Sequence, residues 1–222
     1  MDFYLKFKEP FIAILRGPPN IGKSFCIRNM VYSCSTLKYM DRIYVVCADP
    51  DHDGYRSYIP EGNIYSYLTR TRKRKDMNSL PEWECPLLSN LINYQKINPD
   101  SRCWLILDGC LDMISLRYHE EWKRTLSQCK AYGISVIIST HHVNRRLPPY
   151  VKYIATHVLI WKYPCYRKRQ VLHRDFLHGS GLRKDALSLL REHHFLFMDH
   201  VNNRYEGIYN MKSIPDFKLI CS

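Results

Sequence analysis

The sequence predicts an α/β protein with a mostly parallel sheet, helices on both faces and a C-terminal antiparallel strand pair. Strand-like and helix-like segments alternate along the chain. The strand-like segments are continuous apolar runs, such as "CWLILD" (103–108) and "ISVIIST" (134–140). The last two, "HFLFMDH" and "YEGIYN", are joined by the turn "VNNR", which is typical of an antiparallel pair.

In the first half of the chain, "PFIAILRG" (10–17) is predicted to be a buried strand, and "FCIRNMVYSCSTL" (25–37) a helix. "RIYVVCAD" (42–49), rich in β-branched and aromatic residues, predicts a second strand. Regular patterning is lost from 50 to 86, and a helix is expected at 87–97.

In the second half, strand 103–108 is followed by a helix at 115–133, in which apolar residues recur every three to four positions. Strand 134–140 comes next. A further strand is expected at 156–162 and a helix at 182–192.

The size and composition are those of one globular domain, with 222 residues, 45% of them hydrophobic and 24% charged. We expect a single domain over 1–222, with its core at about 10–162 and a C-terminal extension at 163–222. No apolar run approaches the roughly 18 residues of a membrane span. The N-terminus lacks the apolar segment of a secretory signal, so an intracellular location is expected.

The sequence contains no convincing zinc or calcium motif. Its nine cysteines are scattered without a C-x-x-C pair, which favours buried, reduced thiols. "DPDHDGY" (49–55) imitates the start of an EF-hand loop, but Pro60 stands where that loop needs a glutamate.

The net charge of +12, from 33 Lys and Arg against 21 Asp and Glu, favours a polyanionic partner. Nucleic acid is the first candidate.

The segment "GPPNIGKS" (17–24) matches the phosphate-binding pattern G-x-x-x-x-G-K-[ST] between a predicted strand and a predicted helix. Its glycines let consecutive N–H groups face inward, and the helix N-terminus adds a partial positive charge. We expect Lys23 to contact the β- and γ-phosphates of ATP and Ser24 to bind Mg²⁺. The predicted nucleotide-binding residues are Gly17, Pro18, Pro19, Asn20, Ile21, Gly22, Lys23, Ser24 and Phe25.

Asp108 ends an apolar strand beyond this loop, where a carboxylate beside Mg²⁺ is needed. The alternative is an aspartate that caps a turn. In hydrolytic P-loop proteins the next residue is often an acid that polarises the attacking water, but here it is Gly109. Asp112 is the best-placed substitute, since "GCLD" could turn back toward the phosphates. Its alternative role is an N-cap of the following helix.

The segment "STHHVNRRLPP" follows the next strand. Thr140 or His141 could sense the γ-phosphate, or belong to an ordinary hydrogen-bonded loop. Arg145 and Arg146 are candidates for an arginine finger, and the alternatives are DNA contact or a solvated position.

Two basic runs, "RTRKRK" (70–75) and "YRKRQ" (166–170), could grip DNA phosphates without reading sequence. The alternatives are solvated charge or, for the first, a nuclear targeting signal. The candidate DNA-binding residues are Arg70, Arg72, Lys73, Arg74, Lys75, Arg167, Lys168 and Arg169.

The phosphate-binding loop, the "LILD" strand end, "IISTHH" and "RRLPPYVKYIATHVLIW" together carry a family resemblance over about residues 10–162. The chain resembles the genome-packaging ATPases of nucleocytoplasmic large DNA viruses, of poxvirus type, in the FtsK–HerA branch of P-loop ATPases.

This resemblance implies a RecA-like core, Mg²⁺-dependent ATP hydrolysis and a homo-oligomeric ring that pumps double-stranded DNA into a capsid. It also implies capsid or portal-region partners and a location in the host-cell cytoplasm (the viral factory) and the virion. Lys23, Ser24, Asp108 and either Thr140 or His141 match its functional positions. Gly109 departs from it, and Lys152 follows "LPPYV" where an arginine is expected, so the finger is not placed.

Two other functions stay open. A nucleoside or nucleotide kinase would suit the chain length, but the net charge and "THH" disfavour it. A weakly hydrolysing ATP-binding DNA clamp or scaffold is supported by Gly109. DNA-stimulated ATP turnover would distinguish the motor from both.

Overall fold

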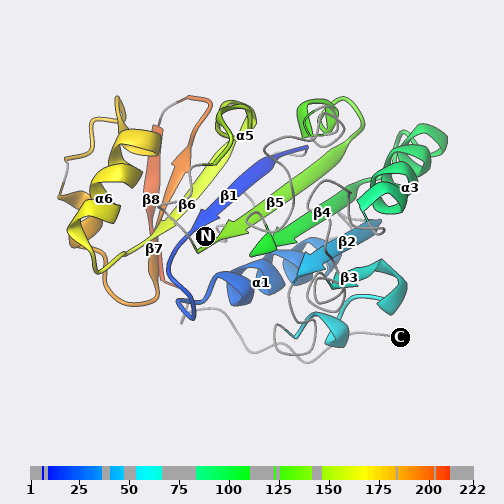
Figure 1. Ribbon diagram of the computed structural model, residues 1–222, viewed down its shortest axis with the longest axis horizontal. Coiled ribbons are helices and arrows are strands. Elements are labelled where there is room, and N and C mark those ends of the chain that lie inside the picture. Colours follow the sequence, from blue (N-terminus) through cyan, green and yellow to red (C-terminus); the bar gives the residue numbers. More distant parts are fainter. Residues whose placement is uncertain are drawn as a thin grey trace, which may run out of the picture.

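The described part of the chain is built around one eight-stranded sheet (Figure 1). In this computed structural model the described residues are 7, 10–36, 41–47, 54–66, 84–110, 123, 126–141, 147–183, 185–202 and 204–210. The strands are β1 (Ile12–Arg16), β2 (Arg42–Cys47), β3 (Ile64–Ser66), β4 (Cys103–Asp108), β5 (Ile134–Thr140), β6 (His157–Trp161), β7 (His194–Asp199) and β8 (Arg204–Asn210).

Their order across the sheet is β3-β2-β4-β5-β1-β6-β7-β8. The pairings from β3 to β6 are parallel, whereas β7 pairs antiparallel with both β6 and β8. The predicted mostly parallel sheet with a C-terminal antiparallel strand pair is therefore confirmed. Because the carboxyl ends of parallel strands meet at one edge, the residues that follow β1, β4 and β5 come together there.

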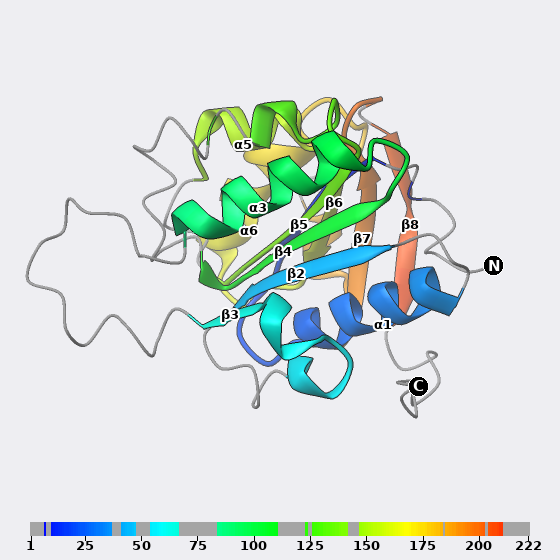
Figure 2. The same ribbon diagram turned by 90° about the vertical axis from the view of Figure 1, so that its right-hand side faces the viewer.

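Helices cover both faces of the sheet, as predicted (Figure 2). The helix α1 (Lys23–Thr36) lies on one face. The helices α3 (Glu84–Ile97), α5 (Pro149–Ile154) and α6 (Tyr166–Leu172) lie on the other, and α6 continues into a π-helix (His173–Leu177).

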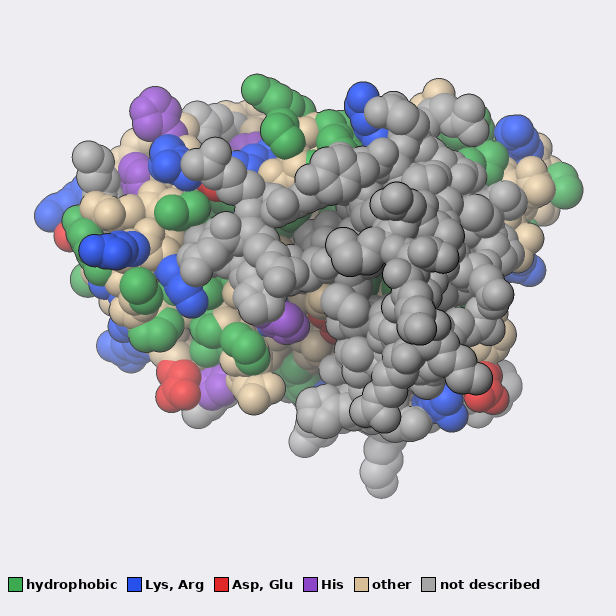
Figure 3. Space-filling view, viewed as in Figure 1, with side chains coloured by type: hydrophobic (Ala, Val, Ile, Leu, Met, Phe, Trp, Pro, Cys, Tyr) green, Lys and Arg blue, Asp and Glu red, His purple; other side chains and the backbone are tan. Residues whose placement is uncertain are grey.

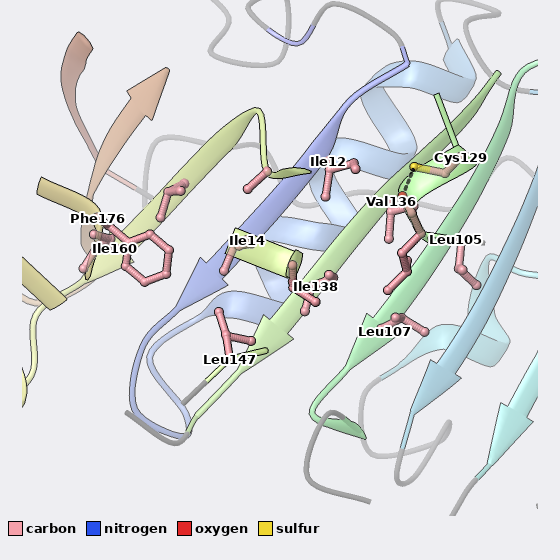
Figure 4. Packing of buried hydrophobic residues seen from close by; sticks show 14 of the residues in the cluster. Ile12, Ile14, Leu105, Leu107, Cys129, Val136, Ile138, Leu147, Ile160 and Phe176 are labelled. Carbon is pink, nitrogen blue, oxygen red and sulfur yellow. Dashed lines mark hydrogen bonds between the residues drawn. The ribbon is translucent and has the colours of Figure 1, made fainter. Parts of the chain in front are cut away.

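Side chains of the central strands alternate between two buried layers, as the two-residue period of a strand requires. On β1, Ile12 and Ile14 join the layer under α3, α5 and α6, whereas Ala13 and Leu15 join the layer under α1. Figure 4 shows part of the first layer on β1 and β5. Burial on both faces explains why these strands are continuously apolar.

Several predicted boundaries need correction. The chain forms α3 from Glu84 rather than from 87, and the short strand β3 lies where regular structure was not expected. Of the helix predicted at 115–133, most residues lie outside the described ones, but 126–128 are helical and Gly133 (φ +68°) follows.

The helix predicted at 182–192 is wrong for the described residues there, which form only a 3₁₀ turn, Ala186–Ser188. Leu187 and Leu190 are buried, whereas Leu189 between them is 73% exposed. Leu187 lies in this turn and Leu190 follows it, so both reach the core without a continuous helix. Tertiary packing thus overrides helix propensity here.

None of the described helices has the length and hydrophobicity of a transmembrane segment. Cys26, Cys47, Cys103, Cys110 and Cys129 are buried free thiols, whereas Cys165 is exposed. Burial raises the pKa of Cys103 to about 12 and that of Cys129 to about 11, so both stay protonated.

His157, the first residue of β6, lies among aromatic rings. It stacks on Phe197 at 5.5 Å between ring centroids, and the Phe7 ring lies 4.7 Å away. Its Nδ1 lies 2.8 Å from the Thr156 hydroxyl. Burial lowers the pKa of His157 to about 4, although the charge of Asp199 opposes this.

We expect this histidine to make folding pH-dependent. Between pH 6.5 and about 4 the unfolded chain takes up a proton at His157 that the folded chain does not, so the free energy of unfolding falls as pH falls. His157→Phe should flatten this fall by up to about 3 kcal/mol. Urea unfolding at several pH values measures how the free energy of unfolding depends on pH. The exposed control His178→Gln should keep the wild-type slope, and an unchanged slope in His157→Phe would contradict the prediction.

Candidate nucleotide-binding site

Residues 17–22 form the turn between β1 and α1, as the phosphate-binding pattern predicts. Asn20 and Gly22 have positive φ values of 58° and 101°. The φ value at Gly22 strongly favours glycine, because residues with a side chain rarely adopt it. The Gly17 N–H donates to the carbonyl oxygen of Thr140 at 3.4 Å, which fixes the start of the turn to β5.

Gly17 is also required by close packing. A Cβ atom at this position would lie 2.8 Å from Ile21 Cγ2 and 2.9 Å from Trp161 Cβ. Trp161 ends β6 and is fully buried. The turn is therefore pressed between its own Ile21 and the neighbouring strand.

Lys23, the first residue of α1, folds back over this turn. Its Nζ donates to the carbonyl oxygens of Gly17 and Pro18 at 2.9 and 2.6 Å, and the residue is only 3% exposed. Burial lowers the pKa of Lys23 to about 8, partly offset by the charge of Asp108. An ammonium group with so little hydration is available to bind an anion at the turn.

Asp108 ends β4, the strand end at which the sequence placed it, and lies beside Ser24. Its Oδ2 accepts hydrogen bonds from the Ser24 hydroxyl at 2.9 Å and the Tyr55 hydroxyl at 2.8 Å. Its Oδ1 is buried and has no hydrogen-bond partner among the described residues. The same holds for the hydroxyl of Ser139, the neighbour of Asp108 on β5.

These residues fit a magnesium ion. Mg²⁺ prefers oxygen ligands and binds through one or two protein oxygens together with water and phosphate. The Ser24 hydroxyl and the Asp108 carboxylate are such ligands, and the buried Oδ1 is an acceptor that an ion or its water would satisfy.

Gly109 has φ +68°, and its N–H donates to the carbonyl oxygen of Ser139 at 3.0 Å. A glutamate here would have to adopt a left-handed backbone, which costs roughly 1–2 kcal/mol, whereas an aspartate tolerates that backbone better. The backbone at position 109 therefore suits glycine better than a glutamate. Asp112, the proposed substitute, lies outside the described residues.

Thr140 ends β5 and His141 follows it. Sequence reasoning missed Arg16, the hydrogen-bond partner of Thr140. Arg16 is fully buried, donates from Nη1 to the Thr140 hydroxyl at 3.4 Å, and lies 5.9 Å from the Phe176 ring centroid. The Tyr163 hydroxyl donates to the His141 carbonyl oxygen at 2.9 Å.

The strand alternation places the Arg16 and Thr140 side chains on the face of the sheet opposite to Asp108. A γ-phosphate-sensing role for Thr140 or His141 stays a prediction. An arginine at the end of an apolar strand, directly before the loop, was the available signal for Arg16.

The other predicted basic residues fall into two groups. In α6, Arg169 donates to the carbonyl oxygens of Tyr163 and Pro164 at 2.8 and 2.6 Å, so it braces the loop after β6. Arg167 is exposed, and Lys168 is half-buried. Figure 3 shows Lys and Arg side chains (blue) over the α6 end of the molecule. Outside the described residues lie Arg70, Arg72, Lys73, Arg74, Lys75, Arg145 and Arg146.

Lys152, at the position where the resemblance leads one to expect an arginine, lies in α5. Its Nζ is 2.9 Å from Asp175 Oδ2, in a partly buried ion pair. In this structure Lys152 therefore contacts its own chain.

Tyr55 is the other functional candidate that sequence reasoning missed. It lies 53 residues before Asp108 and belongs to no motif, so only the folded chain brings the two together.

Known structures share this fold. No protein-family model matches the chain, and no curated protein matches it. The genome packaging NTPase B204 from Sulfolobus turreted icosahedral virus 2, in complex with AMPPCP, superposes with a TM-score of 0.69 at 15% identity, over 90% of this chain and 97% of that one. Its complex with ATP-gammaS gives 0.69 at 14% identity, over 92% and 98%.

Two larger proteins contain a similar unit. The pCW3 conjugation coupling protein TcpA gives a TM-score of 0.57 at 11% identity, over 91% of this chain and 61% of that one. The type VII secretion ATPase EccC of Thermomonospora curvata gives 0.57 at 12% identity, over 89% and 24%. The chain therefore has a P-loop ATPase fold.

The packing of Gly17 can be tested with a single methyl group. Gly17→Ala should lower the free energy of unfolding by about 1–3 kcal/mol, because the added Cβ overlaps Ile21 and Trp161. Gly62→Ala is the control, since a Cβ at Gly62 meets nothing within 4 Å. It should change stability by less than about 0.5 kcal/mol. Urea unfolding compares the two variants with the wild type. Equal free energies of unfolding for Gly17→Ala and Gly62→Ala would refute the close packing of Gly17 against Ile21 and Trp161.

Proposed function

We propose that the chain is a Mg²⁺-dependent ATPase of the FtsK–HerA branch that translocates double-stranded DNA and packages a viral genome. The observation that carries the ATPase part is the Ser24–Asp108 hydrogen bond beside the buried Lys23. It joins the first turn of α1 to the end of β4 at the edge where the phosphate-binding turn lies. The shared fold with B204, described as a genome packaging NTPase, supports the packaging part.

In this proposal the turn, Lys23, Ser24 and Asp108 bind the phosphates of ATP and the magnesium ion. The backbone N–H groups of the turn and the N-terminus of α1 attract the anionic phosphates. Lys23 exchanges its bonds to the Gly17 and Pro18 carbonyls for phosphate oxygens. Ser24 and Asp108 hold Mg²⁺, which when bound neutralises part of the phosphate charge.

Activation of the attacking water is assigned to Asp112, because Gly109 carries no side chain. Thr140 or His141 senses the γ-phosphate in this proposal, and Arg145 or Arg146 of a neighbouring subunit in a ring supplies the finger. The poxvirus-type affiliation, the homo-oligomeric ring, the capsid or portal-region partners, and the location in the host-cell cytoplasm and virion follow from the resemblance of the sequence.

DNA is the substrate class that the charge supports. A net charge of +12 favours a polyanion, and a translocase needs contacts to phosphates that ignore sequence. Arg167 is exposed and Lys168 half-buried at the N-terminal end of α6, and both are available for such contacts.

A second candidate is an ATP-binding DNA clamp that hydrolyses slowly. Gly109 favours the clamp, because glycine adopts its left-handed backbone readily and supplies no carboxylate that could activate water. The two candidates differ in turnover, not in ATP binding.

ATP turnover with and without duplex DNA tests the proposal. We expect DNA to stimulate turnover and rising salt to remove the stimulation. Lys23→Ala and Asp108→Asn should each lower turnover by at least about a hundredfold. Lys96→Ala, at an exposed position at the end of α3, should leave turnover unchanged.

The remaining outcomes distinguish the alternatives. ATP binding with no DNA-stimulated turnover would favour the clamp. Phosphate transfer to a nucleoside or nucleotide without DNA would favour the kinase. Undiminished ATP binding by Lys23→Ala would refute all three.

The depressed pKa of Lys23 makes a separate prediction. A bound triphosphate favours the ammonium form, so ATP binding should take up protons above about pH 8, where the Lys23 amine is largely neutral. ATP affinity should then fall by at most about tenfold per pH unit as pH rises further. Calorimetry in buffers of different ionisation enthalpy counts the protons. Lys23→Ala should lose this uptake, and a flat wild-type profile would contradict the prediction.

A further inference from the structure

Tyr55 brings a distant segment of the chain to the candidate metal site. It is the first residue of a 3₁₀ turn (Tyr55–Ser57) that follows β2, and Gly54 before it has φ +72°. Tyr55 is fully buried, and its ring lies 5.7 Å from that of Tyr58. Its hydroxyl lies 2.8 Å from Asp108 Oδ2. A buried phenol needs a hydrogen-bond partner, and here the partner is the carboxylate that ends β4.

The two oxygens of Asp108 are used unequally. Oδ2 accepts from both Ser24 and Tyr55, whereas Oδ1 accepts from no described residue. Donors from two separate elements, α1 and the 3₁₀ turn, fix the rotation of the carboxylate about its Cβ–Cγ bond. Oδ1 is then the oxygen left open for an ion or for water bound to it.

The two donors differ in what nucleotide binding would do to them. Ser24 is itself a proposed Mg²⁺ ligand, so its hydroxyl would turn from Asp108 toward the ion. Tyr55 is not a proposed ligand and can keep its hydrogen bond. Of these two donors, Tyr55 is the one that would still hold the carboxylate in the loaded site.

Tyr55 serves as a donor and not as the missing base. Burial raises the pKa of its phenol well above the ordinary value, and the negative charge of Asp108 raises it further. The hydroxyl therefore remains protonated over the whole range of pH in which the protein would work.

From these contacts we infer that Tyr55 is a positioning residue that orients the Asp108 carboxylate toward the magnesium ion of bound MgATP. This inference rests on the proposed ATPase function. It assigns a role in metal binding to the segment that follows β2, which contains no recognisable motif.

The test is Tyr55→Phe in the full chain, which removes the hydroxyl and keeps the ring. MgCl₂ is titrated into protein bound to a fluorescent ATP analogue, and analogue binding is also measured in EDTA. The apparent Mg²⁺ affinity should fall by about tenfold or more, as for other residues that orient metal ligands. Analogue affinity in EDTA should change by less than about twofold, since Lys23 and the turn are untouched. Tyr58→Phe is the matched control and should change neither value, and thermal unfolding confirms that both variants fold.

Three outcomes would overturn the inference. If wild-type protein binds the analogue with strong Mg²⁺ dependence and Tyr55→Phe shows the same dependence, the role of Tyr55 fails while the proposed function stands. Equal losses of analogue affinity with Mg²⁺ and in EDTA would mean that Tyr55 only supports the fold around the turn. A wild-type protein that does not bind the analogue would remove the proposed function and, with it, this role.

Discussion

The site depends on one hydrogen bond that crosses the sheet, from the Ser24 hydroxyl to Asp108. The strands β1 and β4 are separated by β5, so their backbones lie about 10 Å apart. A serine at the end of β1 would not span that distance. The turn at 17–22 carries the chain sideways instead, and the first turn of α1 places Ser24 against β4. This path needs Gly17, because a Cβ there would overlap Ile21 and Trp161. It needs Gly22, because the φ value there is positive.

This geometry gathers charges where burial is costly. Arg16, Lys23 and Asp108 are each less than 5% exposed. They lie at the end of β1, the start of α1 and the end of β4, at one edge of the sheet. Buried ionisable groups destabilise a fold unless they are paired, so their concentration at one edge is typical of a functional site. Lys23 and Asp108 offset part of each other's cost through their opposite charges.

The Asp108 region also shows how the chain departs from the pattern it resembles. The usual acid is replaced by Gly109, whose left-handed backbone lets the chain turn sharply after β4. In exchange the carboxylate gains a phenol donor, Tyr55, from a segment with no motif. The Asp108 carboxylate is thus held by two donors, whereas position 109 carries no side chain that could act on water.

The sequence by itself determined the parallel strands, the C-terminal pair and the turn with Lys23 and Ser24. These features depend on neighbouring residues, because a buried strand needs a continuous apolar run and a phosphate-binding turn needs its glycines at fixed spacing. Asp108 was predictable for the same reason, as the polar end of such a run. Only the tertiary structure decided that Tyr55 contacts Asp108, that Arg16 contacts Thr140, and that the described residues of 182–192 do not form the predicted helix. These outcomes depend on contacts between segments far apart in the chain, and such contacts leave no periodic pattern in the residues that make them.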